Sequence, residues 1–292
     1  MKLSMRSAVV RVLLAAAFAG AVFAATSSAA SSVDSAAAKL VPAKIKAKGT
    51  VVVAEDASYA PDEFIGSDGH TVVGMDADLA KAIFPLLGLK VNVVNAVFGT
   101  IIPGLSSGKY DVGMSSMTDE RSREKQVNFV DYFKAGTSFF VKASGGPKIT
   151  NLDSICGLTV SVEAGTTELA DATAQKAKCT KEGKKPDNVL PFPTQSNANL
   201  ALASGRAQVA MADSPVAAYQ VKRSNGEFKL IGQSYGVAPY GIAVPKQDGT
   251  LNKAILLALQ DLIKSGKYAS ILSQWGVQSG SDLHPKLDGA IF

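Results

Sequence analysis

Segments typical of strands alternate with segments typical of helices between residues 49 and 263, and this alternation limits the possible folds more than any other feature. Apolar residues at 79, 82, 83 and 86, and again at 251, 255, 259, 262 and 263, recur with the period of a helix. Short β-rich stretches such as Thr50–Ala54 and Leu158–Val162 separate the helix-like segments. Strands that alternate with helices predict a parallel sheet covered by helices, so we expect an α/β fold.

The alternation is interrupted at Ser144–Pro147, where two glycines precede a proline. Two α/β series predict two lobes with a cleft between them, the usual place for a small-molecule site. In the first series we expect strands at Thr50–Ala54, Lys90–Val94, Tyr110–Met114 and Thr137–Val141, and helices at Asp78–Leu87 and Ile101–Ser107. In the second we expect strands at Leu158–Val162, Val189–Phe192, Gln208–Ala212, Phe228–Ile231 and Gly241–Val244, and helices at Thr166–Lys178, Asn197–Ser204, from Ser214 onward and at Leu251–Ile263.

The first 24 residues have the pattern of a secretory signal peptide. Three basic residues in Met1–Arg11 precede the apolar run Val12–Ala24, and small residues follow. A run of this length is too short to span a bilayer, which needs about 20 apolar residues. We expect cleavage after Ala24, with a site near Ala30 as the alternative. Residues 25–47, rich in Ala, Ser and Lys, are then expected to form a flexible leader.

Loss of this peptide lowers the formal net charge from +5 to +2, because it carries three basic residues and no acid. No run of Lys and Arg is interleaved with aromatic residues. The sequence therefore gives no support for nucleic-acid binding.

Cys156 and Cys179 are the only cysteines. An even number of cysteines in an exported chain predicts a disulfide, and two buried thiols are the alternative. The loop that the bridge would close contributes on the order of 3 kcal/mol in the chain-entropy model.

Five motifs carry a family resemblance. Gly74–Leu79 resembles the G-F-D-x-D-L signature of the bacterial extracellular solute-binding proteins of family 3, which bind polar amino acids. The similarity extends from about residue 49 to residue 277. The other four motifs, in matching order and spacing, are Tyr59–Pro61 with Glu63 and Phe64; Phe98–Pro103; Gly108–Asp111 with Thr118, Arg123 and Phe129; and Gly266–Tyr268 with Trp275 and Gly276.

The resemblance implies a type II periplasmic-binding fold, in which the chain crosses twice between two α/β lobes. Lobe 1 would comprise residues 48–133 and 241–292, and lobe 2 residues 138–236. The crossings would lie near residues 133–137 and 236–240. Such a protein captures a polar or basic L-amino acid outside the cytoplasm, in the periplasm or at the cell surface. It then delivers the amino acid to an ABC permease of the inner or cell membrane. We expect a monomer with no cofactor, no metal and no enzymatic activity.

The α-carboxylate of such a ligand needs a cation, and a guanidinium meets a carboxylate best with two parallel hydrogen bonds. The family's carboxylate-binding Arg lies twelve residues after an Asp and six before a Phe. Arg123 fits both spacings, and Arg121 fits neither. Thr118 matches the family's hydroxyl and amide donor, and the carbonyl of Ser116 matches the position facing the ammonium. Thr166 and Thr167 open a helix, whose free N–H groups favour an anion.

The resemblance also assigns the ammonium and side-chain ends of the ligand. Asp213 matches the family's ammonium-binding Asp, with a helix-capping role as the alternative. Tyr59 and Phe98 match an aromatic pair that sandwiches the ligand side chain, although either could simply belong to the core. Asp56 matches a polar position at the side-chain end, Asp62 replaces an aromatic, and Glu163 stands where the glutamine binder has Lys. Three acids at this end favour a cationic or polar ligand over glutamate.

Other classes of protein fit less well. Gly104–Gly108 has the form G-x-S-x-G, but this motif needs a strand before the serine and a helix after it. The expected order here is the reverse. His70 and His284 lie in a loop and a tail, and no Cys/His cluster suggests a metal. Two alternatives stay open: a dehydratase of cyclohexadienyl acids on the same fold, with Glu163 as general acid, and a solute-sensing subunit of a signalling system.

Overall fold

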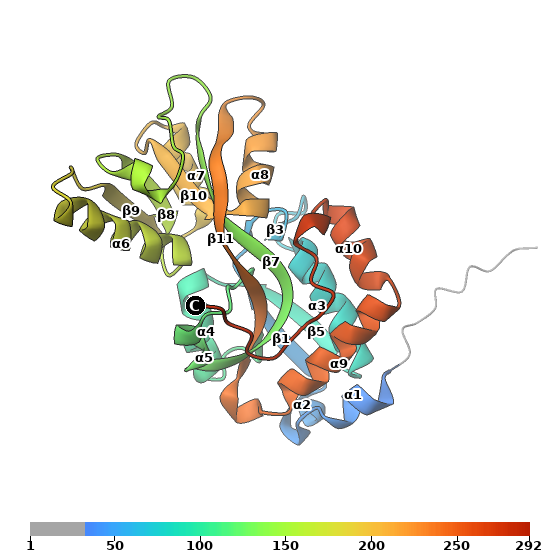
Figure 1. The fold of residues 1–292 in the computed structure, drawn as a ribbon. Coiled ribbons are helices and arrows are strands. Elements are labelled where there is room, and N and C mark those ends of the chain that lie inside the picture. Colours follow the sequence, from blue (N-terminus) through green and yellow to red (C-terminus); the bar gives the residue numbers. More distant parts are fainter. Residues whose placement is uncertain (1–32) are drawn as a thin grey trace, which may run out of the picture. The chain divides into compact units, whose positions relative to one another are not determined.

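The computed structural model describes residues 33–292. The expected signal peptide and both cleavage sites lie outside the described residues. The described part forms a mixed eight-stranded sheet of order β5-β1-β6-β11-β7-β10-β8-β9, with helices on its faces (Figure 1). The sheet has two parallel halves, joined by two long antiparallel strands in its middle. The predicted α/β fold of two lobes is therefore confirmed.

The first lobe is built on the parallel strands β5, β1 and β6. Its core combines apolar side chains of these strands with those of the flanking helices. A small antiparallel sheet, β2-β3-β4, lies beside it. The elements are β1 (Thr50–Glu55), β2 (Ser58–Tyr59), β3 (Glu63–Ile65), β4 (Val72–Val73), α3 (Met75–Leu86), β5 (Lys90–Asn95), α4 (Ile101–Ser106), β6 (Val112–Gly113), α5 (Arg121–Glu124), α9 (Leu251–Lys264) and α10 (Lys267–Trp275).

The second lobe is built on the parallel strands β10, β8 and β9. Its smaller core contains Phe139, Val160, Val162 and Met211. The elements are β8 (Thr159–Glu163), α6 (Thr167–Lys181), β9 (Asn188–Phe192), α7 (Gln195–Ala203), β10 (Val209–Asp213) and α8 (Ser214–Arg223).

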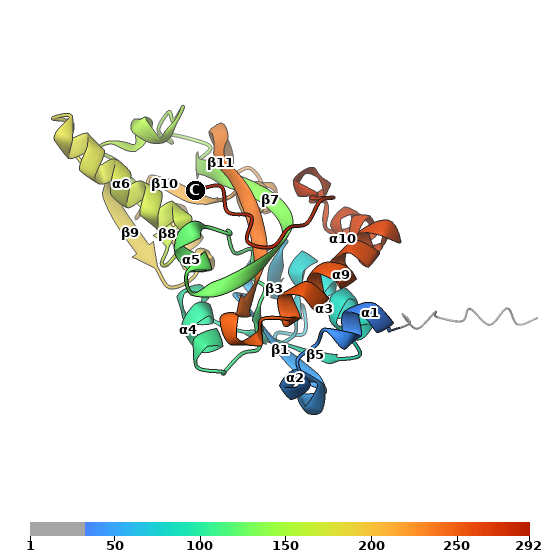
Figure 2. The same ribbon diagram turned by 60° about the horizontal axis from the view of Figure 1, so that its bottom comes forward.

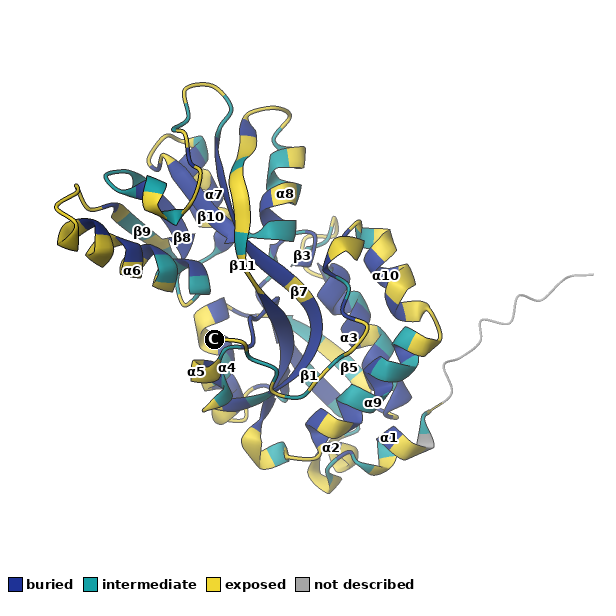
Figure 3. Ribbon diagram, viewed as in Figure 1, coloured by how far each residue is buried: buried dark blue, intermediate teal, exposed yellow. Residues whose placement is uncertain are grey.

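Two long strands, β7 (Val127–Lys142) and β11 (Phe228–Pro245), run through both lobes and pair antiparallel to each other. We expected a short strand at Thr137–Val141 and two separate strands within β11. Instead each crossing is a continuous strand. The pairing between the two strands continues through the crossing, with shifts of register between Ile231 and Gly241. Figure 3 shows both strands buried in the first lobe, whereas β11 is largely exposed in the second lobe, where it forms the edge of the sheet.

The expectation of a flexible leader is wrong for residues 33–47. Helices α1 (Ser35–Lys39) and α2 (Ala43–Lys48) occupy this segment, and α1 packs beside α9 (Figure 2). Asp34 caps α1 by accepting hydrogen bonds from the next helical amides. The side chains of Ala37, Val41 and Ile45, four residues apart, are buried in the core of the first lobe. The overall composition concealed this apolar stripe.

Helix α3 starts three residues earlier than expected, because Gly74 allows a sharp turn of the backbone just before the helix. Gly74 has φ 136°, a conformation that side chains rarely adopt, and a Cβ there would overlap the main chain of Asp62. Two acids, Asp76 and Asp78, lie in the first turn of the helix, where its dipole favours them. Pro85 lies next to the last residue of α3, so it does not break the helix.

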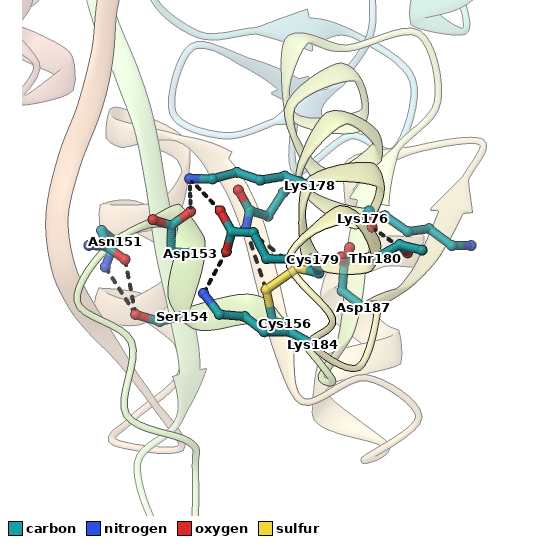
Figure 4. Close-up of a disulfide and its surroundings, with 12 residues drawn as sticks. Asn151, Asp153, Ser154, Cys156, Lys176, Lys178, Cys179, Thr180, Lys184 and Asp187 are labelled. Carbon is teal, nitrogen blue, oxygen red and sulfur yellow. Dashed lines mark hydrogen bonds and ion pairs between the residues drawn. A yellow bond between two sulfur atoms is a disulfide. The ribbon is translucent and has the colours of Figure 1, made fainter.

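The predicted disulfide between Cys156 and Cys179 is present (Figure 4). It ties the buried side of α6 to the loop before β8, and Gln175 donates to both sulfur atoms. Lys178 pairs with Asp153 beside it, at the surface. In residues 33–292 no helix has the length and apolar character needed to cross a membrane.

Replacement of both cysteines by serine should destabilise the protein by about 3 kcal/mol, because the unfolded chain regains the freedom of the loop that the bridge closes. Urea unfolding of wild type and of Cys156→Ser/Cys179→Ser measures the difference. Reduced wild type serves as the matched control and should unfold at the same urea concentration as the double variant. An unchanged urea midpoint in the double variant would contradict the prediction.

Candidate functional site

A small pocket lies between the two lobes. Both lobes contribute to its wall, so the cavity depends on their approach. The structure brings together most of the predicted site residues here, and adds Glu168, Gln195 and Ala212. The lining residues are Tyr59, Phe98, Ser116, Thr118, Arg123, Thr166, Thr167, Glu168, Gln195, Ala212 and Asp213.

Arg123 lies on the single turn of α5, with its side chain buried. Its Nη1 donates to the carbonyl of Thr118 at 2.8 Å, and its Nη2 donates to the carbonyl of Gly165 in the second lobe at 3.0 Å. Its Nε lies 3.3 Å from Glu120 Oε1. The guanidinium also lies over the ring of Phe98, 5.3 Å from the ring centre. One N–H on each terminal nitrogen remains free to bind a carboxylate.

The N-terminus of α6 faces Arg123 from the second lobe. Thr166 caps the helix: its hydroxyl accepts from the amide of Leu169 and donates to the carbonyl of Glu163. The hydroxyl of Thr167 is 3.3 Å from Glu168 Oε2. The free amides of this turn are suited to an anion, so they complement the guanidinium.

Tyr59 and Phe98 form an edge-to-face pair, with ring centres 5.9 Å apart. Asp56 fixes this wall from behind: its carboxylate accepts from the amide of Phe98 at 2.8 Å and from the hydroxyl of Ser58 at 2.7 Å. Asp56 is buried and does not line the cavity. Its carboxylate orients the aromatic wall.

Ser116 lines the cavity with an uncommon backbone, at φ 45°. Its amide donates to Asp76 Oδ2 at 2.8 Å, and its hydroxyl reaches Asp62 and Glu63. Asp62 is fully buried and does not line the cavity. These carboxylates hold the turn of Ser116 against the floor of the cavity.

Asp213 ends β10 and lies at the start of α8. Its side chain makes no capping hydrogen bond to that helix, so it remains available to the cavity. Burial, followed by the nearby carboxylate of Glu168, raises the pKa of Asp213 well above its usual range.

Glu163 ends β8 and is fully buried outside the cavity lining. Both carboxyl oxygens are buried, with Tyr59 and Asp56 as polar neighbours. Burial, followed by the neighbouring Asp56, raises the pKa of Glu163 to about 9. The side chain therefore holds its proton at neutral pH.

Sequence reasoning missed Glu168 and Gln195. Glu168 is buried at the start of α6, where its Oε1 accepts from Thr137 Oγ1 of β7 at 2.8 Å. Gln195 opens α7, and its main-chain N–H donates to the hydroxyl of Ser58 in the first lobe at 3.1 Å. An acid in the first turn of a helix is ordinary, which hid Glu168. Its position directly after the Thr166–Thr167 turn was the available signal.

The cavity wall is more acidic than basic. Glu168 and Asp213 line it, with Glu163, Asp56 and Asp62 behind, whereas Arg123 is the only cationic side chain in the lining. No group of three or more His, Cys, Asp or Glu side chains within the described part of the chain is arranged to hold a metal ion. Such a wall suits a ligand with one carboxylate and more than one positive charge.

Two α/β lobes joined by crossing strands, with a pocket lined by both lobes between them, are the architecture of the periplasmic-binding type of solute-binding protein. Residues 51–278 match the family model described as bacterial extracellular solute-binding proteins, family 3. The chain belongs to this family.

The chain is similar to the arginine-binding protein ArgT of Corynebacterium glutamicum: 34% identical over 242 residues, which cover 82% of this chain and 79% of that protein. It also resembles the solved structure of an ancestral arginine-binding protein bound to arginine, with a TM-score of 0.71 and 37% identity over 78% of this chain and 98% of that one. A third relative is the ancestral amino acid-binding protein AncCDT-1, a precursor of cyclohexadienyl dehydratase. Its TM-score is 0.68, with 32% identity over 80% of this chain and 97% of that one.

Glu163→Gln should stabilise the ligand-free protein at alkaline pH. The pKa of Glu163 is raised to about 9 in the folded state, so its contribution to folding stability is full only below the pKa that Glu163 has in the unfolded chain. This stability is lost as pH rises from there toward 9. The neutral amide avoids this loss, so we expect a gain of about 1–3 kcal/mol at pH 8–9 that shrinks toward pH 5. Urea unfolding at several pH values measures it. The exposed Glu227→Gln is the matched control and should change nothing. Parallel pH profiles for wild type and Glu163→Gln would contradict the prediction.

Proposed function

We propose that this protein captures a basic L-amino acid of the arginine class and delivers it to an ABC importer. The observation that carries the proposal is the charge of the cavity wall: one guanidinium at one end and an excess of carboxyl groups elsewhere. Family membership and the similarity to arginine-binding proteins support the same ligand class.

The ligand carboxylate binds between the lobes. Arg123 supplies its two remaining N–H donors from the first lobe, with the hydroxyl of Thr118 beside it. The amides at Thr166 and Thr167 supply donors from the second lobe. A buried carboxylate needs several such partners to offset the loss of water.

The α-ammonium binds Asp213, with the carbonyl of Ser116 as a second acceptor. Burial and then the nearby carboxylate of Glu168 raise the pKa of Asp213. A bound ammonium stabilises the ionised form and lowers this pKa again.

The ligand side chain extends along Tyr59 and Phe98 toward Glu168 and Gln195. Aromatic faces attract cations, and Glu168 supplies a buried negative charge. Asp56 and Asp62 act from behind the wall, where they orient groups that contact the ligand. Glu163 holds its proton at neutral pH and adds no charge to the wall.

Binding is coupled to closure of the lobes. We place lobe 1 at residues 48–133 and 241–292, lobe 2 at residues 138–236, and the bending regions at residues 133–137 and 236–240. The ligand binds the first lobe through Arg123 and Tyr59, and the second lobe then closes. A ligand that contacts both lobes only in the closed state favours that state. The permease recognises the closed form.

We further propose that the protein is exported by its N-terminal signal and acts as a monomer in the periplasm or at the cell surface. A dehydratase would need a protonated acid over the substrate ring. Glu163 holds its proton but lies behind the cavity wall, so the geometry favours binding without catalysis. Within residues 33–292, no feature favours the sensor alternative.

Arg123→Ala should weaken binding of L-arginine by about 2–5 kcal/mol, which is roughly 30-fold to several thousand-fold in Kd. The variant loses the cation that pairs with the ligand carboxylate. Isothermal titration calorimetry measures the affinity, with the other common amino acids as a comparison panel. Arg121→Ala is the matched control, because Arg121 is on the same turn with an exposed side chain, and should bind as wild type does. Equal affinities for Arg123→Ala and wild type would overturn the site.

A further inference from the structure

Residues 286–292 lie beyond the family match, which ends at residue 278. The segment runs alongside the first-lobe half of β7, on the side away from β11 (Figures 1 and 2). The carbonyl of Lys286 accepts from the amide of Asp131 at 2.9 Å, and Asp288 Oδ1 accepts from the amide of Phe129 at 2.7 Å. The segment therefore occupies an edge of the sheet that would otherwise be open.

The end of this segment then turns to the residues around Arg123. Asp119 Oδ2 accepts from the amide of Gly289 at 2.8 Å, and Glu124 Oε1 accepts from the amide of Ala290 at 3.1 Å. The amide of Arg121 donates to the carbonyl of Phe292 at 3.0 Å. Three hydrogen bonds thus hold the residues on both sides of Arg123.

The turn that carries Arg123 needs such support. Helix α5 has four residues, and Glu120 before it provides no side-chain cap. A single turn of helix is not stable by itself, because nucleation fixes several residues for one hydrogen bond. The guanidinium position therefore depends on contacts made by the flanking residues.

Gly289 makes the contact possible. It lies against Asp131 of β7, and a Cβ at this position would overlap Asp131 Oδ2. Phe292 reaches a second cavity, which shares Thr118 and Thr167 with the ligand site. The segment thus connects the crossing strand to the edge of the binding cavity.

We propose that residues 286–292 are a positioning segment that holds α5 so that the Arg123 guanidinium meets the ligand carboxylate. The inference rests on the proposed function, because it concerns the same site. None of its residues lines the ligand pocket, so it would act through Arg123.

A double-mutant cycle tests this role. Gly289→Ala displaces the segment and should weaken binding of L-arginine by about tenfold in the wild-type background. In the Arg123→Ala background the same change should alter Kd by less than about twofold, since the guanidinium it positions is absent. Gly249→Ala is the matched control, because Gly249 is exposed with room for a Cβ. Its replacement should leave the affinity for L-arginine unchanged in both the wild-type and the Arg123→Ala background.

Equal losses in both backgrounds, or no loss in either, would overturn the proposal. Ala290→Pro, which removes the amide bound by Glu124 and restricts the backbone of the segment, is a second variant in case Gly289→Ala does not fold. Hydrogen–deuterium exchange of the ligand-free protein gives an independent readout. Residues 119–126 should exchange at least several-fold faster in Gly289→Ala than in Gly249→Ala, and equal rates would refute the positioning role of residues 286–292. If wild type does not bind L-arginine, the proposed function fails, whereas the exchange result still decides the role of the segment.

Discussion

Transfer of a charged amino acid from water into an enclosed cavity costs free energy unless each charge finds a partner. Arg123 supplies the partner for a carboxylate, and it already contacts Thr118 of one lobe and Gly165 of the other. The remaining wall is acidic, with Glu168 and Asp213 at the surface of the cavity. In the proposed function, this charge distribution suits a zwitterion with an additional positive charge that contacts both lobes.

The fold serves this arrangement through its two continuous crossing strands. Because β7 and β11 pair along most of their length, the lobes are held in a fixed order around the cavity while the register shifts near the middle leave places to bend. Thr137 lies at this crossing and donates to Glu168, so the bending region and the acidic wall are in direct contact.

The sequence predicted the parts of the site that depend on local order. The spacing around Arg123 and the Thr166 cap are fixed by neighbours along the chain, and the structure places both residues at the cavity. It did not predict Glu168 or Gln195, whose positions depend on how the lobes pack. Nor could the sequence tell a side chain that faces the cavity from one that faces the lobe, so Asp56, Asp62 and Glu163 were expected at the ligand and lie behind the wall. Ala37, buried with α1 in the core, shows the same difficulty: α9, against which α1 packs, is some 200 residues away in the chain.

The central claim is that charge, rather than shape alone, selects the ligand. L-Citrulline has nearly the shape of L-arginine but a neutral ureido group in place of the guanidinium. Calorimetric titration of the wild-type protein with both compounds separates the two contributions. The account predicts that L-citrulline binds about ten- to a hundredfold more weakly, the range expected for loss of a charged hydrogen-bonding partner. Equal or tighter binding of L-citrulline would contradict it.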